Sequence, residues 1–187
     1  MTATARRCLS SPSSSSGSAL SLLTSLCRSN QGILQQKLIL IDLLKQKHGD
    51  DNAKTVYKDI CPTVKASIGQ HVRHSMDHLE RATMNAATAC SGGGGIGGGA
   101  EIVDEIHYDL RRRGGVDEHD IDAAANRIHR VYNAVDELLL HHSEEGAYNL
   151  VNSKVNACFM LSGDSDAEFV IPSTAARELG FAAHHGT

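Results

Sequence analysis

The chain has 187 residues, of which 41% are hydrophobic, enough for one domain with a substantial core. Only 4% are aromatic and none is tryptophan, so the core must consist of Leu, Ile, Val and Ala, as is typical of helical proteins. A formal charge of −4 without a basic stripe argues against a nucleic-acid-binding surface, and no apolar run approaches the roughly 20 residues of a membrane span.

The five cysteines are odd in number and contain no C-x-x-C pair. This pattern fits neither a disulfide framework nor a zinc-thiolate site, so all five are expected to be free thiols. A reducing compartment is therefore expected, either the cytoplasm or an organelle such as a mitochondrion or plastid, and not secretion. The positions are Cys8, Cys27, Cys61, Cys90 and Cys158.

The amino-terminal segment contains no acidic residue, while three arginines lie among many serines. This composition is typical of an organelle transit peptide, but a disordered tail that frays into the first helix explains the serines equally well. Both alternatives assign residues 1–30 to a transit peptide or tail and residues 31–187 to the folded domain. Residues 1–29 are therefore expected to be dispensable for folding.

Apolar residues recur at helical spacing from Leu34 to Leu44, which predicts a first helix over residues 31–47, or one that starts as early as Ser18. The segment HGDDN is expected to end it. A second helix is predicted over residues 63–89, because a proline precedes this stretch and proline is tolerated at a helix start but not inside.

A glycine run, CSGGGGIGGG, follows the second helix and formally contains the phosphate-binding pattern G-x-G-x-x-G. A phosphate cradle needs a strand before the glycines and a helix after them, whereas this run follows a helix and precedes acidic residues. The run is therefore predicted to be a flexible linker. An extended piece, EIVDEIHYDLRRRGG, comes next.

A third helix is predicted from Asp117 or Asp120 to His141. Two apolar segments, VNACFML and AEFVI, are separated by the turn-forming SGDSD and predict a small β-hairpin. Ser173 or Thr174 is expected to cap a fourth helix that has barely begun when the sequence ends. These elements predict a mainly all-α fold, an up-and-down four-helix bundle with a truncated fourth helix and the hairpin before it.

Three histidines, His71, His74 and His78, lie within about 60° of one another on the second predicted helix. A pair four residues apart can share one metal ion, as two histidines do in zinc-protease helices. His184 and His185 on the fourth helix are expected to approach the same level of the bundle. The alternative is that these imidazoles face solvent, since a chain with 11 histidines clusters some of them by chance.

Three segments resemble, in order and spacing, the DinB-like (DinB/YfiT-type) metalloenzyme superfamily: SIGQHVRHSMDHLERA, EIHYDLRRRGGVDEHDIDAAANRI and STAARELGFAAHH. The resemblance implies a four-helix bundle in which a histidine of helix two and an H-x-x-x-H pair of helix four hold a divalent ion, commonly zinc, nickel or iron. It implies His74 as the helix-two ligand, with His78 as the next candidate, and His185 as the first member of the pair. The second member is expected four residues later, whereas the sequence ends two residues after His185.

Further candidates surround these predicted ligands. Asp77 is a candidate for orienting an imidazole, although a salt bridge to an arginine four residues away is the favoured role. Tyr108, Asp109 and Arg111 match the second segment of the resemblance and are expected to line the mouth of the bundle. The competing interpretation of these three residues is a solvated charge run.

The expected function is that of a divalent-metal-dependent enzyme acting on a small molecule, either a hydrolase or a thiol-dependent transferase, as the resemblance implies. A metal-bound water of lowered pKa, or a metal-bound thiolate, would attack the substrate. Two alternatives stay open: a non-catalytic helical bundle that binds another helix or chain, and an incomplete gene model without a functional site. A homodimer that buries exposed apolar surface is also expected.

Overall fold

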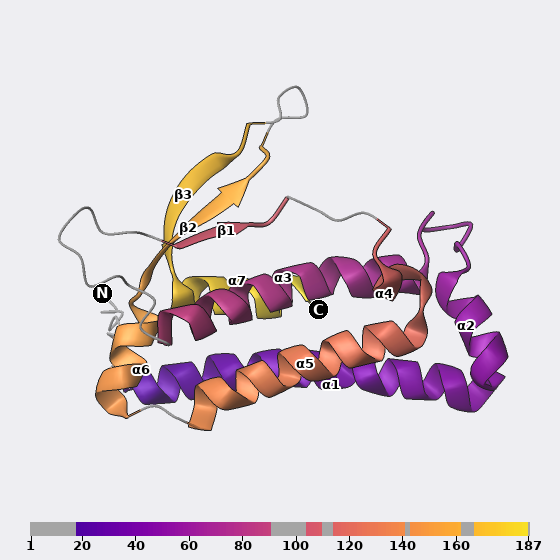
Figure 1. Cartoon of the computed structure of the whole chain (residues 1–187), viewed down its shortest axis with the longest axis horizontal. Helices are drawn as coiled ribbons and strands as arrows, with labels where there is room; N and C mark the ends of the chain where they lie inside the picture. Colours follow the sequence, from indigo (N-terminus) through magenta and orange to yellow (C-terminus); the bar gives the residue numbers. More distant parts are fainter. Residues whose placement is uncertain (1–17, 91–103, 110–113, 141–142, 162–166, 187) are drawn as a thin grey trace, which may run out of the picture.

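The computed structural model describes residues 18–90, 104–109, 114–140, 143–161 and 167–186, and this part contains seven helices and three strands (Figure 1). The fold is mostly helical with a small sheet. None of the helices in these ranges combines the length and apolarity needed to cross a bilayer. The elements are α1 (Ala19–His48), α2 (Asp50–Lys58), α3 (Ile68–Cys90), β1 (Asp104–His107), α4 (Val116–His119), α5 (Ile121–Leu140), α6 (Glu144–Val151), β2 (Lys154–Phe159), β3 (Phe169–Thr174) and α7 (Ala175–His185).

The first helix begins at the earlier of its two predicted starts. Ser18 caps α1, its hydroxyl accepting a hydrogen bond from the Ser21 N–H at 3.1 Å. Leu23 and Cys27 are each only 1% exposed, so this first part of α1 belongs to the core. The predicted domain boundary at residue 30 therefore falls inside a packed helix. The rest of the predicted tail, residues 1–17, lies outside the described residues.

Three short helices, α2, α4 and α6, were not predicted. Gly49, with a φ of 74°, turns the chain between α1 and α2 in a conformation that glycine adopts without strain, so HGDDN redirects the chain into a second helix. Of the two predicted starts of the third helix, the structure confirms Asp120, whose side chain accepts hydrogen bonds from the N–H groups of Asp122 and Ala123 and so caps α5, whereas Asp117 lies in the short helix α4. The short helix α6 is capped by Ser143.

The helix that carries the histidines starts at a reciprocal cap. The Gln70 N–H donates to the Ser67 hydroxyl at 3.1 Å, and the Ser67 N–H donates to the Gln70 side-chain oxygen at 2.9 Å. This capping box begins α3 at Ile68, later than the predicted start at residue 63, because it satisfies the first free backbone donors there. Most of the glycine run, from residue 91 onward, lies outside the described residues.

The sheet has the order β1-β2-β3. Strands β2 and β3 pair antiparallel, which confirms the predicted hairpin, and β1 adds to β2 in parallel. The connection from β1 to β2 contains α4, α5 and α6. Thr174 caps α7 directly after β3, its hydroxyl accepting from the Arg177 N–H, as one of the two predicted caps.

The helices form two layers, with α1 beside α5 in one and α3 beside α7 in the other, and the sheet projects from the second layer (Figure 1). The main core lies between the layers and consists of aliphatic side chains, as the composition predicts. A smaller core lies between the sheet and α7, with Phe181 packed against it. Its buried members are Ile106, Tyr108, Val155 and Ala157.

Candidate metal centre

Three imidazoles from two helices converge at the junction of α3 and α7. His74 and His78 lie one turn apart on α3, and His185 is the last residue of α7. Each offers one ring nitrogen, and these three nitrogens all lie within 4.8 Å of one another. The Nε2 atoms of His74 and His185 are 3.1 Å apart. We call these residues the histidine triad.

The spacing of the histidine triad is close to that of a metal site. Two imidazole nitrogens bound tetrahedrally at 2.0–2.1 Å from one ion are about 3.4 Å apart. The His78 and His185 ring centroids are 4.0 Å apart, and the His74 ring lies 5.1 Å from each of them. Small side-chain rotations would therefore bring three nitrogens to one ion, and the residues present fit such a group.

The three histidines of the triad differ in their exposure to solvent. His78 is 6% exposed, His74 is half-buried and His185 is exposed. Beside it lies a cleft of about 420 Å³, to which His74 and His185 both contribute. His71, which the resemblance does not imply as a ligand, also borders this cleft but is outside the triad. The site therefore has one closed side and one side open to a small molecule.

Contacts from α1 set the position of α7 and hence of His185. The Asn30 side chain donates to the Leu179 carbonyl of α7 at 3.0 Å and to the Leu26 carbonyl of its own helix at 2.8 Å. The Lys37 ammonium donates to the Gly186 carbonyl at the end of α7, at 3.1 Å. Burial lowers the pKa of Lys37. These two bonds fix both ends of the last turns of α7 against α1.

Aromatic rings form the closed wall. The Tyr108 ring stacks on His78 at 5.1 Å between centroids, and the Phe181 ring stacks on His185 at 5.5 Å. The Tyr108 hydroxyl donates to the buried Glu178 carboxylate at 2.7 Å. Burial and the Glu178 charge raise the pKa of Tyr108, so the phenol stays protonated as a donor. The wall therefore limits the rotation of His78 and His185.

The other predicted candidates have different surroundings. Asp77 forms ion pairs with Arg73 and with Arg127, each at 2.8 Å, which confirms the favoured salt-bridge role. Asp109 accepts a hydrogen bond from the Met160 N–H at 2.8 Å, just after β2. Arg111 lies outside the described residues, so its predicted place at the mouth of the bundle has no structural counterpart here.

Two residues of the wall were not predicted from the sequence. Glu178 is fully buried and also accepts hydrogen bonds from Ser173 and Arg177. The sequence did not single it out, because an acidic residue in the first turn of a helix is ordinarily explained by its interaction with the helix dipole. Phe181 is one of only three phenylalanines, and that rarity is the only signal that singled it out. For the thiols, the prediction is confirmed at the three cysteines whose side chains the structure describes, since none of Cys27, Cys61 and Cys158 forms a disulfide.

No protein-family model, curated protein or solved structure matches this chain.

Proposed function

We propose that this protein binds one divalent metal ion through His74, His78 and His185 and acts as a metal-dependent enzyme of the DinB-like type. The observation that carries the proposal is the convergence of three ring nitrogens, from two separate helices, within 4.8 Å. Three neutral imidazoles suit zinc, nickel or iron. Three protein ligands with an open side are the usual arrangement of a catalytic rather than a structural metal site.

The ligand set differs in one respect from the one that the resemblance implies. There, a second histidine of the last helix completes the site, whereas in this proposal His78 of α3 fills the third position beside His74. The four helices of a DinB-like bundle would correspond to α1, α3, α5 and α7. The packing of α7 against both α1 and α3 supports this correspondence.

The ion would supply Lewis-acid chemistry, for hydrolysis or for transfer to a thiol. The side chains around it would have separate tasks. His74 and His185 border the cleft of about 420 Å³, which lies in the range of sites for small-molecule substrates. Tyr108 and Phe181 exclude water from the opposite side and hold two of the imidazole rings.

A second proposal concerns association. Ile39 and Leu43 lie one turn apart on α1 and are both exposed, with the exposed Leu40 beside them. A second copy of the chain that covers these side chains would form the homodimer expected from the sequence. Sedimentation of the protein and of an Ile39→Lys variant separates this interaction from the metal-dependent activity, because the variant should be monomeric and keep its metal.

The metal proposal is tested by counting bound ions in wild type and variants after equilibration with Zn²⁺. His74→Ala and His78→Ala should each contain one equivalent less than wild type, because each loses one of three ligands. His71→Ala is the matched control, since it removes an imidazole of the same helix and cleft but outside the triad. Equal metal content in wild type, His74→Ala and His78→Ala would overturn the proposal.

A further inference from the structure

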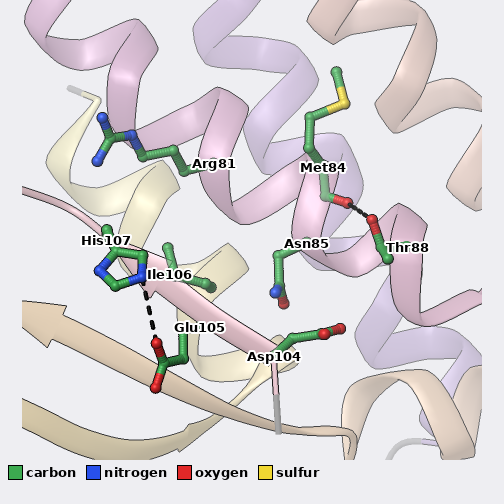
Figure 2. Close-up of a pocket in the computed structure, with 8 residues that line it drawn as sticks. All are labelled: Arg81, Met84, Asn85, Thr88, Asp104, Glu105, Ile106 and His107. Carbon is green, nitrogen blue, oxygen red and sulfur yellow. Dashed lines mark hydrogen bonds and ion pairs between the residues drawn. The ribbon is translucent and has the colours of Figure 1, made fainter. Parts of the chain in front are cut away.

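A second group of mixed donors lies on the sheet. In the parallel pairing of β1 with β2, His107 is opposite Cys158. Glu105 lies two residues before His107, and side chains two apart on a strand project to the same face. One donor atom from each of these three residues lies within 4.8 Å of the other two. Figure 2 shows Glu105 and His107 side by side on β1, with the Glu105 carboxylate 3.4 Å from His107 Nε2.

This group is separate from the histidine triad. Ile106 and Tyr108 alternate with Glu105 and His107 along the chain and are buried in the small core, where Tyr108 stacks on His78. Because alternate residues of a strand point to opposite faces, the sheet lies between the two groups. Neither group can share its ion with the other without rearrangement of β1.

A fourth side chain orients the imidazole of the sheet group. The Glu168 carboxylate lies 2.6 Å from His107 Nδ1, which leaves Nε2 directed to Glu105 and available as a ligand. A carboxylate on the far nitrogen is the usual support of a metal-binding histidine, since it fixes the tautomer and the ring plane. The other oxygen of Glu168 is buried and has no hydrogen-bond partner within the described part of the chain.

The surroundings of Cys158 favour a cation. Its side chain is only 1% exposed although it lies on the face that carries Glu105 and Glu168. Burial and the charges of these two carboxylates raise the pKa of the thiol. A bound divalent ion would reverse this effect, because a coordinating thiol loses its proton and the ion balances the negative charges around it.

We propose that Glu105, His107 and Cys158 form a second metal site, selective for Zn²⁺ and similar borderline ions. A donor set of one sulfur, one imidazole and one carboxylate suits zinc and cobalt, whereas Mg²⁺ and Ca²⁺ require oxygen ligands. Glu105 and His107 border a pocket of about 530 Å³ between β1 and α3, which gives the ion a route of entry (Figure 2). Arg81, Met84, Asn85 and Thr88 of α3 form its other side.

The test uses Co²⁺ as a spectroscopic substitute for zinc in the full-length protein. Sulfur ligation of Co²⁺ produces a near-ultraviolet charge-transfer band that imidazole and carboxylate ligands do not produce. The band should appear in wild type and in His74→Ala, and it should vanish in Cys158→Ser. Cys61→Ser is the matched control, since Cys61 is an exposed thiol away from the sheet, and it should keep the band.

His107→Gln and Glu105→Gln provide variants on side chains that are not buried, so they stay informative if Cys158→Ser does not fold. Each should weaken Co²⁺ binding at this site by about tenfold or more. The proposal is overturned if wild type shows no sulfur-to-cobalt band, or if both substitutions leave the affinity unchanged. A band that persists in His74→Ala while one equivalent of metal is lost would support both sites independently.

Discussion

The Tyr108 hydroxyl donates a 2.7 Å hydrogen bond to the Glu178 carboxylate, while the face of the same ring lies 5.1 Å from His78. The Tyr108 side chain, directly after β1, therefore contacts both helices of the histidine triad, α7 through its hydroxyl and α3 through its ring. The ring packing and the hydrogen bond have separable consequences, because phenylalanine keeps the first and removes the second.

Tyr108→Phe should lower the free energy of unfolding by about 1–3 kcal/mol, because it leaves one oxygen of a buried carboxylate without its donor. Zinc affinity should change by less than about threefold, since the ring that limits His78 is retained. Urea unfolding and zinc titration measure the two effects. Tyr148→Phe is the control, because Tyr148 is 61% exposed, and it should change stability by less than about 0.5 kcal/mol. Tyr108→Ala, which removes the ring as well, serves as the comparison. If Tyr108→Phe lost as much metal affinity as Tyr108→Ala, the ring packing and the hydrogen bond would not have separable effects.

Gly69→Ala tests the contact between α3 and α4. A Cβ at Gly69 would lie 2.1 Å from the Glu118 carbonyl oxygen and 2.8 Å from the Tyr57 ring, so the two helices must move apart. We expect a loss of about 1–3 kcal/mol in the free energy of unfolding, measured by urea denaturation.

Gly32→Ala is the matched control for this substitution. Gly32 lies inside α1, and a Cβ there meets no atom within 4 Å. The change should raise the free energy of unfolding by about 0.5–1 kcal/mol, because alanine loses less backbone entropy in a helix than glycine does. If both substitutions changed the free energy of unfolding in the same direction, the close approach at Gly69 would not explain the result.

Periodicity predicted the parts of this fold in which one face of a long helix is buried. The apolar stripe of α1 and the histidine spacing of α3 are local patterns, so they are visible in the sequence. The short helices α2 and α6 were not predicted, because helices of eight or nine residues contain too few apolar positions to show the helical period of hydrophobic residues.

The two candidate metal sites also differ in how far the sequence predicts them. The histidine pair on α3 follows from a spacing of four. The expected bundle brought His184 and His185 to the same level, and the resemblance to a family favoured His185 of the two. The Glu105, His107 and Cys158 group depends on the register between two strands that are separated by three helices, and no local pattern encodes that register. The burial of Glu178 depends on the docking of α7 on the sheet, which is equally remote from its own sequence neighbours.

Truncation tests whether residues 18–29, the cap and first part of α1, belong to the folded domain. Removing residues 1–29 should lower the free energy of unfolding by about 3 kcal/mol or more relative to removing residues 1–17, because it deletes the buried Leu23 and Cys27 from the core. Thermal and urea denaturation of the two truncated proteins measure the difference. A difference within about 1 kcal/mol would restore the original expectation that this segment is dispensable.

An ionic network joins α3 to α5, and it lowers the pKa of one of its carboxyl groups. Glu80 accepts a hydrogen bond from Arg130 at 2.5 Å and another from Arg127 at 2.8 Å, and Arg127 also pairs with Asp77 and Asp117. Burial alone would raise the pKa of Glu80, but the hydrogen bond from Arg130 and the charge of Arg127 lower it below its ordinary value of 4.5. The folded state therefore holds the proton of Glu80 more weakly than the unfolded chain does.

The final prediction follows from the sign of that shift. A carboxylate whose pKa is lowered by folding stabilises the protein fully above its ordinary, unfolded pKa, and this stability is lost as the pH falls through the folded pKa. Glu80→Gln should therefore cost about 1 kcal/mol at pH 7 and progressively less below about pH 4.5, as the wild type loses the same contribution. Urea unfolding between pH 3 and pH 7 measures both slopes, with the exposed Glu137→Gln on α5 as the control for the lost charge. If the difference between wild type and Glu80→Gln were constant with pH, the pairing with Arg127 and Arg130 would not depend on the Glu80 charge.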